Sequence, residues 1–217
     1  MRIWEVNVRY TCEYAHLLSL YVEEREVLCE QCGVTREPGL LLEWDDGSDQ
    51  IADFTNTFGR IVVKESVADE LLARFTGFKK APVEFFDHPN LYLPKRITRR
   101  TPRRVWLPYE GPPLCELRVT REVDLDERSS VTIEGKCDTC GWTVYKSLEG
   151  MEEHDLAKHV PRQPGKGLYI PESDVAGWDF FRPKYTGLVL CSARVKQFVE
   201  GKGYTNVEFL EAGDTVP

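Results

Sequence analysis

Two five-residue stretches decide the fold expected for this chain: Cys29-Glu30-Gln31-Cys32-Gly33 and Cys137-Asp138-Thr139-Cys140-Gly141. Two residues between the thiolates let both point at one ion from a tight turn, and the following glycine permits the positive φ that such a turn needs. Two such turns supply four sulfurs, which fill the tetrahedral shell of zinc and leave no open position for catalysis. We therefore expect one structural zinc ion per chain, bound by Cys29, Cys32, Cys137 and Cys140.

The two motifs lie unusually far apart in the chain. Between Cys32 and Cys137 there are 104 residues (137 − 32 − 1), whereas a compact zinc ribbon has about 15–20 at this point. A shared metal ion would bring the turns at 29–33 and 137–141 together from distant segments. Structural zinc contributes roughly 10–16 kcal/mol to folding, so we expect the fold to depend on the metal.

The sequence leaves other uses of the four sulfurs open to different degrees. Iron of the rubredoxin type takes the same donor set, so zinc and iron are not distinguished. A thioredoxin-type dithiol is disfavoured, because its low thiol pKa usually comes from a helix N-terminus. The residues after each pair, 34–39 and 142–145, favour turn or strand instead.

Composition indicates an ordinary globular chain, which we expect to form a single domain over residues 1–217. Of the 217 residues, 41% are hydrophobic and 29% charged, and the net charge is −8. The excess of acid disfavours nucleic acid and would suit a basic partner. No apolar run approaches the roughly 18 residues that cross a bilayer, and the first residues lack a signal peptide's apolar stretch. We expect a cytoplasmic protein that does not contact a membrane.

Residues 60–86 predict a strand, a helix and a second strand. The apolar residues change from a continuous run to helical spacing and back to an extended pattern. The expected positions are strand Ile61–Val63, N-cap Ser66, helix Val67–Phe75, stop Gly77 and strand Val83–Phe86.

The C-terminal unit, residues 186–211, repeats the same order of elements. Its expected positions are strand Leu188–Leu190, N-cap Ser192, helix Val195–Val199, stop at Gly201 and Gly203, and strand Val207–Phe209. Two explanations stay open: a degenerate internal repeat, or chance recurrence of short apolar patterns. The repeat would match Val62-Val63 with Val189-Leu190, Leu71-Leu72 with Phe198-Val199, and Val83-Glu84-Phe85 with Val207-Glu208-Phe209.

The remaining chemistry-bearing residues do not indicate an enzyme. The chain has no glycine-rich phosphate loop, no G-x-S-x-G elbow and no H-E-x-x-H motif. His154 and His159 are five apart, which does not place both on one helical face, so we expect a surface segment. The other cysteines, Cys12, Cys115 and Cys191, have no partner at ligand spacing and are expected as small buried hydrophobes.

The paired Cys-x-x-Cys-Gly motifs resemble the bacterial double-CXXCG motif family, whose members include immunity proteins of the Sit contact-dependent toxin system. Asp179-Phe180-Phe181-Arg182, followed by a hydrophobic strand, a helix and Val207-Glu208-Phe209, is similar to that family's closing pattern. The resemblance implies an immunity protein that acts in competition between bacteria by binding and neutralising a cognate protein toxin. It implies neither the toxin nor the binding surface.

The sequence thus predicts an α+β protein, with a mixed sheet, two strand-helix-strand units and a zinc-ribbon-like double Cys knuckle. The expected function is a non-catalytic immunity protein. The alternative is a zinc-ribbon nucleic-acid-binding protein, in which the basic stretch 95–104 holds phosphates and Trp106 or Tyr109 stacks on bases.

Overall fold

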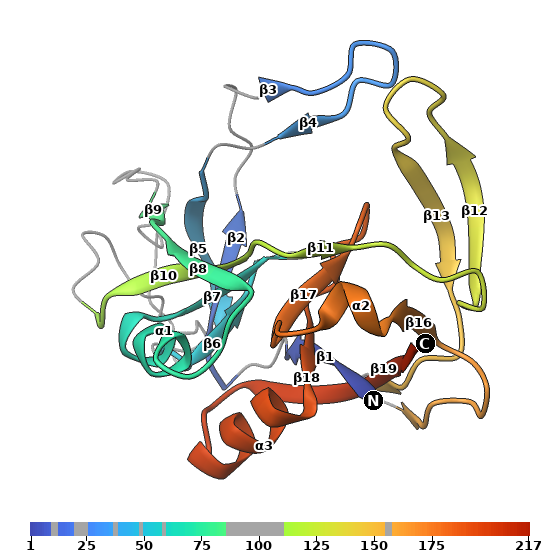
Figure 1. Cartoon of the computed structure of the whole chain (residues 1–217). Helices are drawn as coiled ribbons and strands as arrows, with labels where there is room; N and C mark the ends of the chain where they lie inside the picture. The colour runs from blue at the N-terminus through green and yellow to red at the C-terminus, as the bar shows by residue number, and fades with distance from the viewer. Residues whose placement is uncertain are drawn as a thin grey trace.

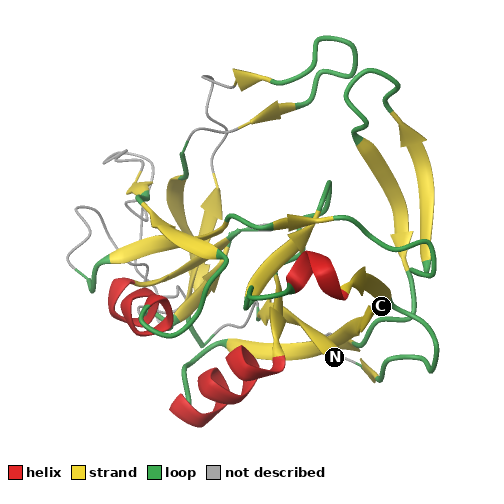
Figure 2. Cartoon of the chain, viewed as in Figure 1, coloured by secondary structure: helices red, strands yellow, loops and turns green. Residues whose placement is uncertain are grey.

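The computed structural model describes residues 1–9, 13–19, 26–36, 39–47, 50–57, 60–85, 111–154 and 158–217. Within these ranges the protein is mixed α+β, built mostly of strands with three helices (Figures 1 and 2). The helices are α1 (Glu65–Leu72), α2 (Glu172–Val175) and α3 (Ala193–Lys202). None of them is long and apolar enough to span a membrane.

A six-stranded mixed sheet forms the centre of the C-terminal part. Its strand order is β11-β17-β18-β1-β19-β16, and β1 is antiparallel to both of its neighbours, β18 and β19. The outer strands β16 and β11 pair in parallel with β19 and β17. The bounds are β1 Arg2–Val8, β11 Glu122–Val123, β16 Leu168–Pro171, β17 Phe180–Pro183, β18 Leu190–Ser192 and β19 Val207–Val216.

The other strands form a four-stranded sheet, a three-stranded sheet and three hairpins. The four-stranded sheet has the order β6-β7-β10-β8, with bounds Phe54–Asn56, Ile61–Lys64, Leu114–Val119 and Phe78–Ala81. The three-stranded sheet is β2 (Ala15–Ser19), β5 (Leu41–Gly47) and β9 (Glu84–Phe85). The hairpins are β3 (Glu26–Val27) with β4 (Thr35–Arg36), β12 (Val131–Lys136) with β13 (Thr143–Leu148), and β14 (Glu153–His154) with β15 (His159–Val160).

The two larger sheets share one topology, which relates the N-terminal half (residues 1–85) to the C-terminal half (residues 111–217). In β6-β7-β10-β8 the helix α1 links β7 to β8, and β10 lies antiparallel between them. In β17-β18-β1-β19 the helix α3 links β18 to β19, and β1 lies antiparallel between them. The inserted strand of each sheet comes from the opposite half of the chain. The molecule is therefore an internal repeat in which the halves exchange their first strands.

Strand register fixes which residues are equivalent. Lys64 and Ser192 are the N-caps of α1 and α3, and they lie opposite Leu114 and Ile3 respectively. Counting along the inserted strands then makes Glu116 equivalent to Glu5, because each lies two residues further on. Glu5 and Glu116 each line a cavity.

Two reciprocal contacts join the halves and obey the same symmetry. Asp53, just before β6, accepts hydrogen bonds from the backbone N–H (2.9 Å) and hydroxyl (3.0 Å) of Thr205, two residues before β19. Asp179, just before β17, accepts from the backbone N–H (3.3 Å) and hydroxyl (3.4 Å) of Thr76, two residues before β8. Each half therefore fixes the strand entry of the other with the same pair of residue types.

The repeat exists, but its predicted alignment is wrong. Equivalence of Lys64 with Ser192 matches Val62 with Leu190, one residue away from the expected match with Val189. The strand that returns to the sheet after α1 is β8, Phe78–Ala81. Of the predicted strand Val83–Phe86, residues 84–85 form β9 in the three-stranded sheet, and Phe86 lies outside the described residues. Short apolar runs tolerate such a shift, and only strand pairing determines the register.

The start of the first helix also differs from the prediction. The N-cap of α1 is Lys64, not Ser66, and the helix ends at Leu72 rather than continuing to Phe75. Strand β7 runs directly into the helix, and the Nζ of the extended Lys64 lies 2.9 Å from Oδ1 of Asp53. The predictions of Ser192 as the N-cap of α3 and of a stop at Gly203, which has φ 67°, are confirmed. The predicted stop at Gly201 is wrong, because that residue lies inside α3.

The main core lies between the two larger sheets and is drawn from both halves. It includes the inner faces of α1 and α3, with Val67 and Leu71 on one helix and Val195 and Val199 on the other. A second core covers the opposite face of the six-stranded sheet. Helices α1 and α3 lie on the side of the main core, whereas α2 packs into the second core through Val175. The hairpins that carry the cysteine motifs project away from α1 and α3 (Figure 1).

Candidate metal centre

The two cysteine motifs form the tips of two hairpins. Knuckle 1, residues 29–33, joins β3 to β4, and knuckle 2, residues 137–141, joins β12 to β13. In each, the glycine N–H donates to the carbonyl of the first cysteine at 2.9 Å. Gly33 and Gly141 have φ of 68° and 73°, the left-handed region that glycine adopts without strain. The local turn is thus the same in both halves.

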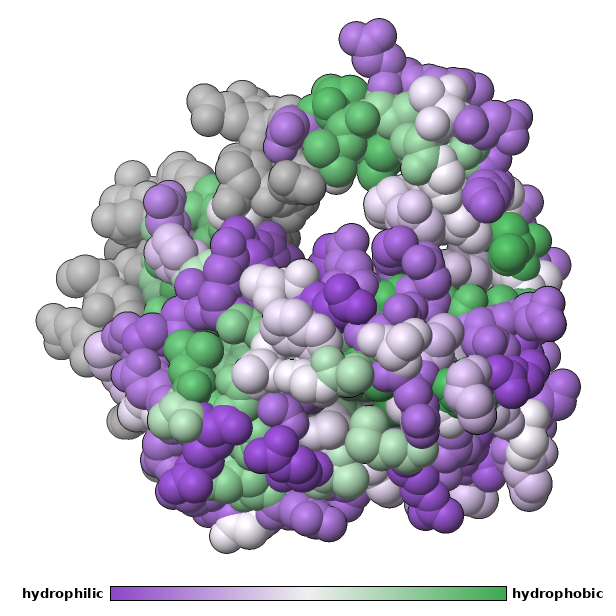
Figure 3. Space-filling view, viewed as in Figure 1, coloured by the Kyte–Doolittle hydropathy of each residue, from purple (hydrophilic) through white to green (hydrophobic). Residues whose placement is uncertain are grey.

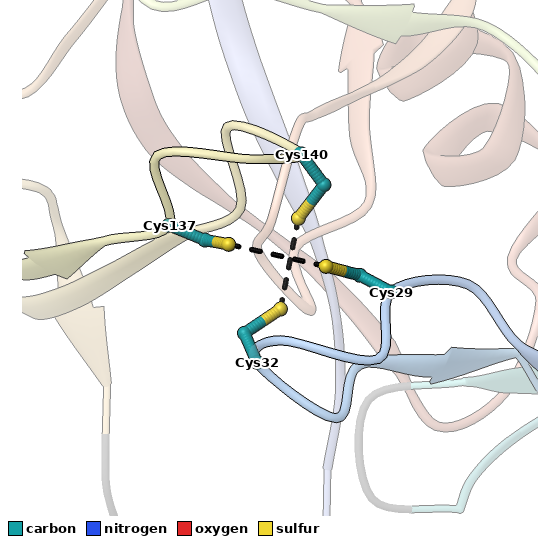
Figure 4. A group of neighbouring side chains, drawn as sticks. All are labelled: Cys29, Cys32, Cys137 and Cys140. Atoms are coloured by element: carbon teal, nitrogen blue, oxygen red, sulfur yellow. Dashed lines mark hydrogen bonds between the residues drawn. The ribbon is translucent and has the colours of Figure 1, made fainter.

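The knuckles meet so that the four sulfurs face one another (Figure 4). All four Sγ atoms lie within 4.8 Å of one another, and Cys29 and Cys32 are 3.9 and 3.6 Å from Cys137 and Cys140 respectively. These four cysteines are free, with no disulfide between them. Tetrahedral metal–sulfur bonds near 2.3 Å give sulfur–sulfur edges of about 3.8 Å, so the observed spacing fits a four-coordinate metal ion.

The centre has an approximate two-fold axis. Cys29 faces its equivalent Cys137, and Cys32 faces its equivalent Cys140. The hydroxyl of Thr139 donates a hydrogen bond to the side-chain carbonyl oxygen of Gln31, which occupies the same place in the other motif. The two knuckles are therefore related by a local two-fold, and each half provides two of the four sulfurs.

Backbone N–H groups favour thiolate at the first cysteine of each motif. The N–H of Cys32 lowers the pKa of Cys29, and the N–H groups of Cys140 and Thr139 lower the pKa of Cys137 to about 7. The N–H of Trp142, 3.4 Å from the sulfur of Cys140, acts in the same direction. Burial and the neighbouring sulfurs oppose it and raise the pKa of Cys140 to about 12.

Such opposed pKa values arise because four thiolates this close repel one another. A cation among them removes that repulsion and lets all four ionise. The donor set is therefore chemically suited to a metal ion, although the sulfurs alone do not select zinc over iron. Both knuckles lead into strands rather than helices, so the helix-based activation of a thioredoxin-type dithiol is absent from them.

Knuckle 2 has a second anchor, which no sequence motif indicated. Trp142 packs edge-on against Tyr185, with ring centroids 5.1 Å apart. Tyr185 has φ 63°, a costly conformation for a residue with a side chain, and lies in the loop between β17 and β18. A Cβ at Gly141 would lie 3.6 Å from the Tyr185 hydroxyl. The body of the protein thus supports knuckle 2 directly.

The other predicted residues lie elsewhere. Cys115 and Cys191 are buried in the main core, as expected for small hydrophobes, and burial raises the pKa of Cys115 to about 11. His154 and His159 face each other across the β14–β15 hairpin, and each contacts a carboxylate, of Glu208 (2.8 Å) and Glu152 (2.6 Å) respectively. Cys12, the basic stretch 95–104, Trp106 and Tyr109 lie outside the described residues.

No protein-family model matches the chain, and a search of curated proteins finds no similar sequence.

Proposed function

We propose that this protein is a non-catalytic immunity protein that binds and neutralises a cognate protein toxin, with one structural zinc ion held by Cys29, Cys32, Cys137 and Cys140. The observation that carries the non-catalytic part is the closed centre. Four sulfurs from two equivalent knuckles fill a tetrahedral shell, so no position is left for a water molecule or substrate. The immunity role rests on the resemblance of the paired motifs and the C-terminal segment to the double-CXXCG family.

Zinc at this centre would supply cohesion rather than chemistry. It would join two hairpins that otherwise contribute little apolar core: Val27, Leu28, Ile133 and Val144 are all exposed. A Lewis-acid role would require an open coordination position, which four cysteine ligands do not leave.

The function is tested by survival of cells that express the product of the neighbouring gene, with and without this chain, followed by copurification. Rescue together with a stable complex is the expected result. A toxic neighbour that this chain neither binds nor neutralises would contradict the proposal. Zinc is tested separately by elemental analysis of the purified protein, with one equivalent per chain expected.

A zinc-ribbon nucleic-acid-binding protein is the second candidate, and the basic stretch 95–104 is the feature that favours it. A gel shift at low salt distinguishes the two candidates. This model expects binding that is lost when Arg99, Arg100, Arg103 and Arg104 are neutralised together. The net charge of −8 opposes it.

A further inference from the structure

A cavity of about 520 Å³ lies beneath the joined knuckles. Its roof includes Leu28 and Trp142 from the two knuckle regions, and its floor is formed by β7, β10 and the loop between β17 and β18. Figure 3 shows the molecule open at this place, with apolar surface above and polar surface below. We call this space the central cavity.

The central cavity adjoins a second, smaller cavity of about 60 Å³, which shares residues 60–61, Gly187 and Val189 with it. The larger cavity is lined by residues 116–119 of β10, and the smaller by residues 5–8 of β1. These strand segments are equivalent in the two halves, so the two cavities are bordered by equivalent elements.

The symmetry is broken at the charged residues of the floor. Glu116 accepts paired hydrogen bonds from Arg60 (2.8 and 2.7 Å) and from Arg118 (3.0 and 2.6 Å). By strand register, the equivalents of Arg60 and Arg118 are Leu188 and Asn7, beside Glu5. Both halves keep the hydrogen bonds between an Asp and a Thr, those of Asp53 with Thr205 and of Asp179 with Thr76. The two guanidinium groups, in contrast, are present on one side of the cavity only.

Glu116 holds the two arginine side chains of the floor in place. Its side chain is only 5% exposed and pairs with two guanidinium groups that are 22% and 30% exposed, those of Arg60 and Arg118. Arg60 has further partners, among them the carbonyl of Gly39, which accepts from its Nη1 at 2.9 Å. The Arg118 guanidinium has five N–H donors in a fixed plane and uses Nε and Nη2 on Glu116, so within the described part of the chain its Nη1 remains to donate to a further acceptor. Groups held in advance in this way bind an anion with little loss of entropy.

The roof of the cavity carries charge of the opposite sign. A divalent ion with four thiolates carries net negative charge, and Cys140 lines the cavity. Leu28, which is 45% exposed, and Trp142 also line the cavity. An occupant should therefore present a carboxylate to the floor and apolar side chains to the roof.

From these observations we infer that the central cavity binds an extended acidic segment of the partner protein, one of whose carboxylates pairs with Arg118 while its apolar side chains contact Leu28 and Trp142. The inference rests on the proposed function in one respect, that the partner is the toxin. The chain's net charge of −8 would suit a basic partner at long range. Inside a cavity, however, the nearest charged groups dominate the field.

The first experiment uses a probe that does not depend on knowing the toxin. A fluorescein-labelled eight-residue peptide that alternates Glu with Phe and Leu is titrated with the metal-loaded full chain, and anisotropy is measured. Controls are the same peptide with Lys in place of Glu and an eight-nucleotide oligothymidine. We expect binding of the acidic peptide, and weakening of at least about tenfold in Arg118→Gln, since hydrogen bonds to charged groups contribute about 1.5–3 kcal/mol.

The matched control is Arg128→Gln. Arg128 pairs with Asp126 at 2.6 Å and does not line the cavity, so this substitution removes the same charge at a site outside the cavity. Arg182→Gln is a second cavity variant that leaves Glu116 untouched, because Arg182 pairs with Glu122. Metal content and melting temperature establish that each variant is folded. Equal binding by wild type, Arg118→Gln and Arg182→Gln would overturn the inference, as would preference for the basic peptide or the oligonucleotide.

A second experiment separates this inference from the proposed function. The toxin complex is challenged with the acidic peptide and formed with Arg118→Gln. Displacement by the peptide and loss of binding in the variant support the inference. A stable complex that neither change affects would overturn the cavity site while leaving the immunity function intact. Peptide binding without any toxin complex would reject the immunity function and retain the cavity site.

Discussion

Glu5 and Glu116 occupy equivalent places, yet their surroundings give them opposite properties. Burial disfavours the charge on Glu116, but hydrogen bonds from Arg60 and Arg118 hold its pKa below the usual value. Within the described ranges no arginine pairs with Glu5, and burial together with the charge of Glu208 raises its pKa to about 7. The same strand position therefore carries a fixed anion in one half and a titrating group in the other.

Glu5 should make stability depend on pH. Its pKa is about 7 in the folded protein and 4.5 in the unfolded chain. The folded state thus favours the protonated form, and its contribution is complete below pH 4.5 and lost as the pH rises to about 7. We expect Glu5→Gln to raise stability by about 1–3 kcal/mol at pH 8 and by much less at pH 5. Denaturant unfolding at both pH values measures this, with the exposed Glu134→Gln as control; a gain independent of pH would contradict it.

The cysteine ligands allow a sharper test of the metal centre. Cys137→Ser removes one sulfur, so we expect loss of stoichiometric metal and a fall in melting temperature of more than about 10 °C, since structural zinc contributes roughly 10–16 kcal/mol and each kcal/mol corresponds to about 2–4 °C in a chain of this size. Cys115→Ala, in the core away from the centre, should keep the metal. Elemental analysis and thermal melts measure both effects. Unchanged metal content in Cys137→Ser would exclude the site.

At the scale of elements, the turn before β8 shows how closely the two sheets approach. Phe180 of β17 donates its N–H to the carbonyl of Thr76 at 2.9 Å, and Phe54 of β6 donates to the carbonyl of Thr205 at 3.3 Å. The second contact is the symmetric equivalent of the first. Gly77, which follows Thr76, has φ 96° and leaves no room for a side chain against β17. The packing of sheet on sheet therefore depends on a glycine at this turn.

Two glycine substitutions should have opposite effects. In Gly77→Ala the new Cβ would lie 1.9 Å from the carbonyl oxygen of Phe180, so we expect a loss of about 3 kcal/mol or more from strain and overpacking. Gly201 lies within α3 with open space around it, so Gly201→Ala should stabilise by about 0.5–1 kcal/mol. Urea unfolding of both variants is the measurement. If both variants lost a similar amount of stability, the close packing of the two sheets at Gly77 would not account for the loss in Gly77→Ala.

At the scale of the whole molecule, the metal centre closes a ring over the central cavity. The two knuckle hairpins meet at the four sulfurs and at the hydrogen bond between Thr139 and Gln31. Knuckle 2 is also held by the Trp142–Tyr185 contact and by the long pairing of β12 with β13. Knuckle 1 is held by the pairing of the two-residue strands β3 and β4. The metal therefore matters more for knuckle 1 than for knuckle 2.

Removal of the metal by a chelator should destabilise the two knuckle hairpins to different extents. We expect amide hydrogen exchange to rise strongly over residues 26–36, less over residues 131–148, and little in β1 and β19, because local stability follows the contacts that remain. Exchange monitored by mass spectrometry with and without chelator measures the difference. Restoration of protection by added Zn²⁺ is the control, and equal loss across all three regions would instead indicate global unfolding.

The sequence by itself determined the candidate metal ligands, the mixed α+β class and the strand-helix-strand order of both units. These follow from short-range patterns: two residues between thiolates, and apolar residues at helical or extended spacing. The strand exchange, the alignment of the repeat and the equivalence of Glu5 with Glu116 were decided only by tertiary structure. They depend on pairing of segments far apart in the chain, such as Leu114 with Lys64 and Ile3 with Ser192, for which local spacing carries no information. The cavity is of the same kind, because Arg60 and Glu116 are 56 residues apart in the chain and meet only when β7 pairs with β10.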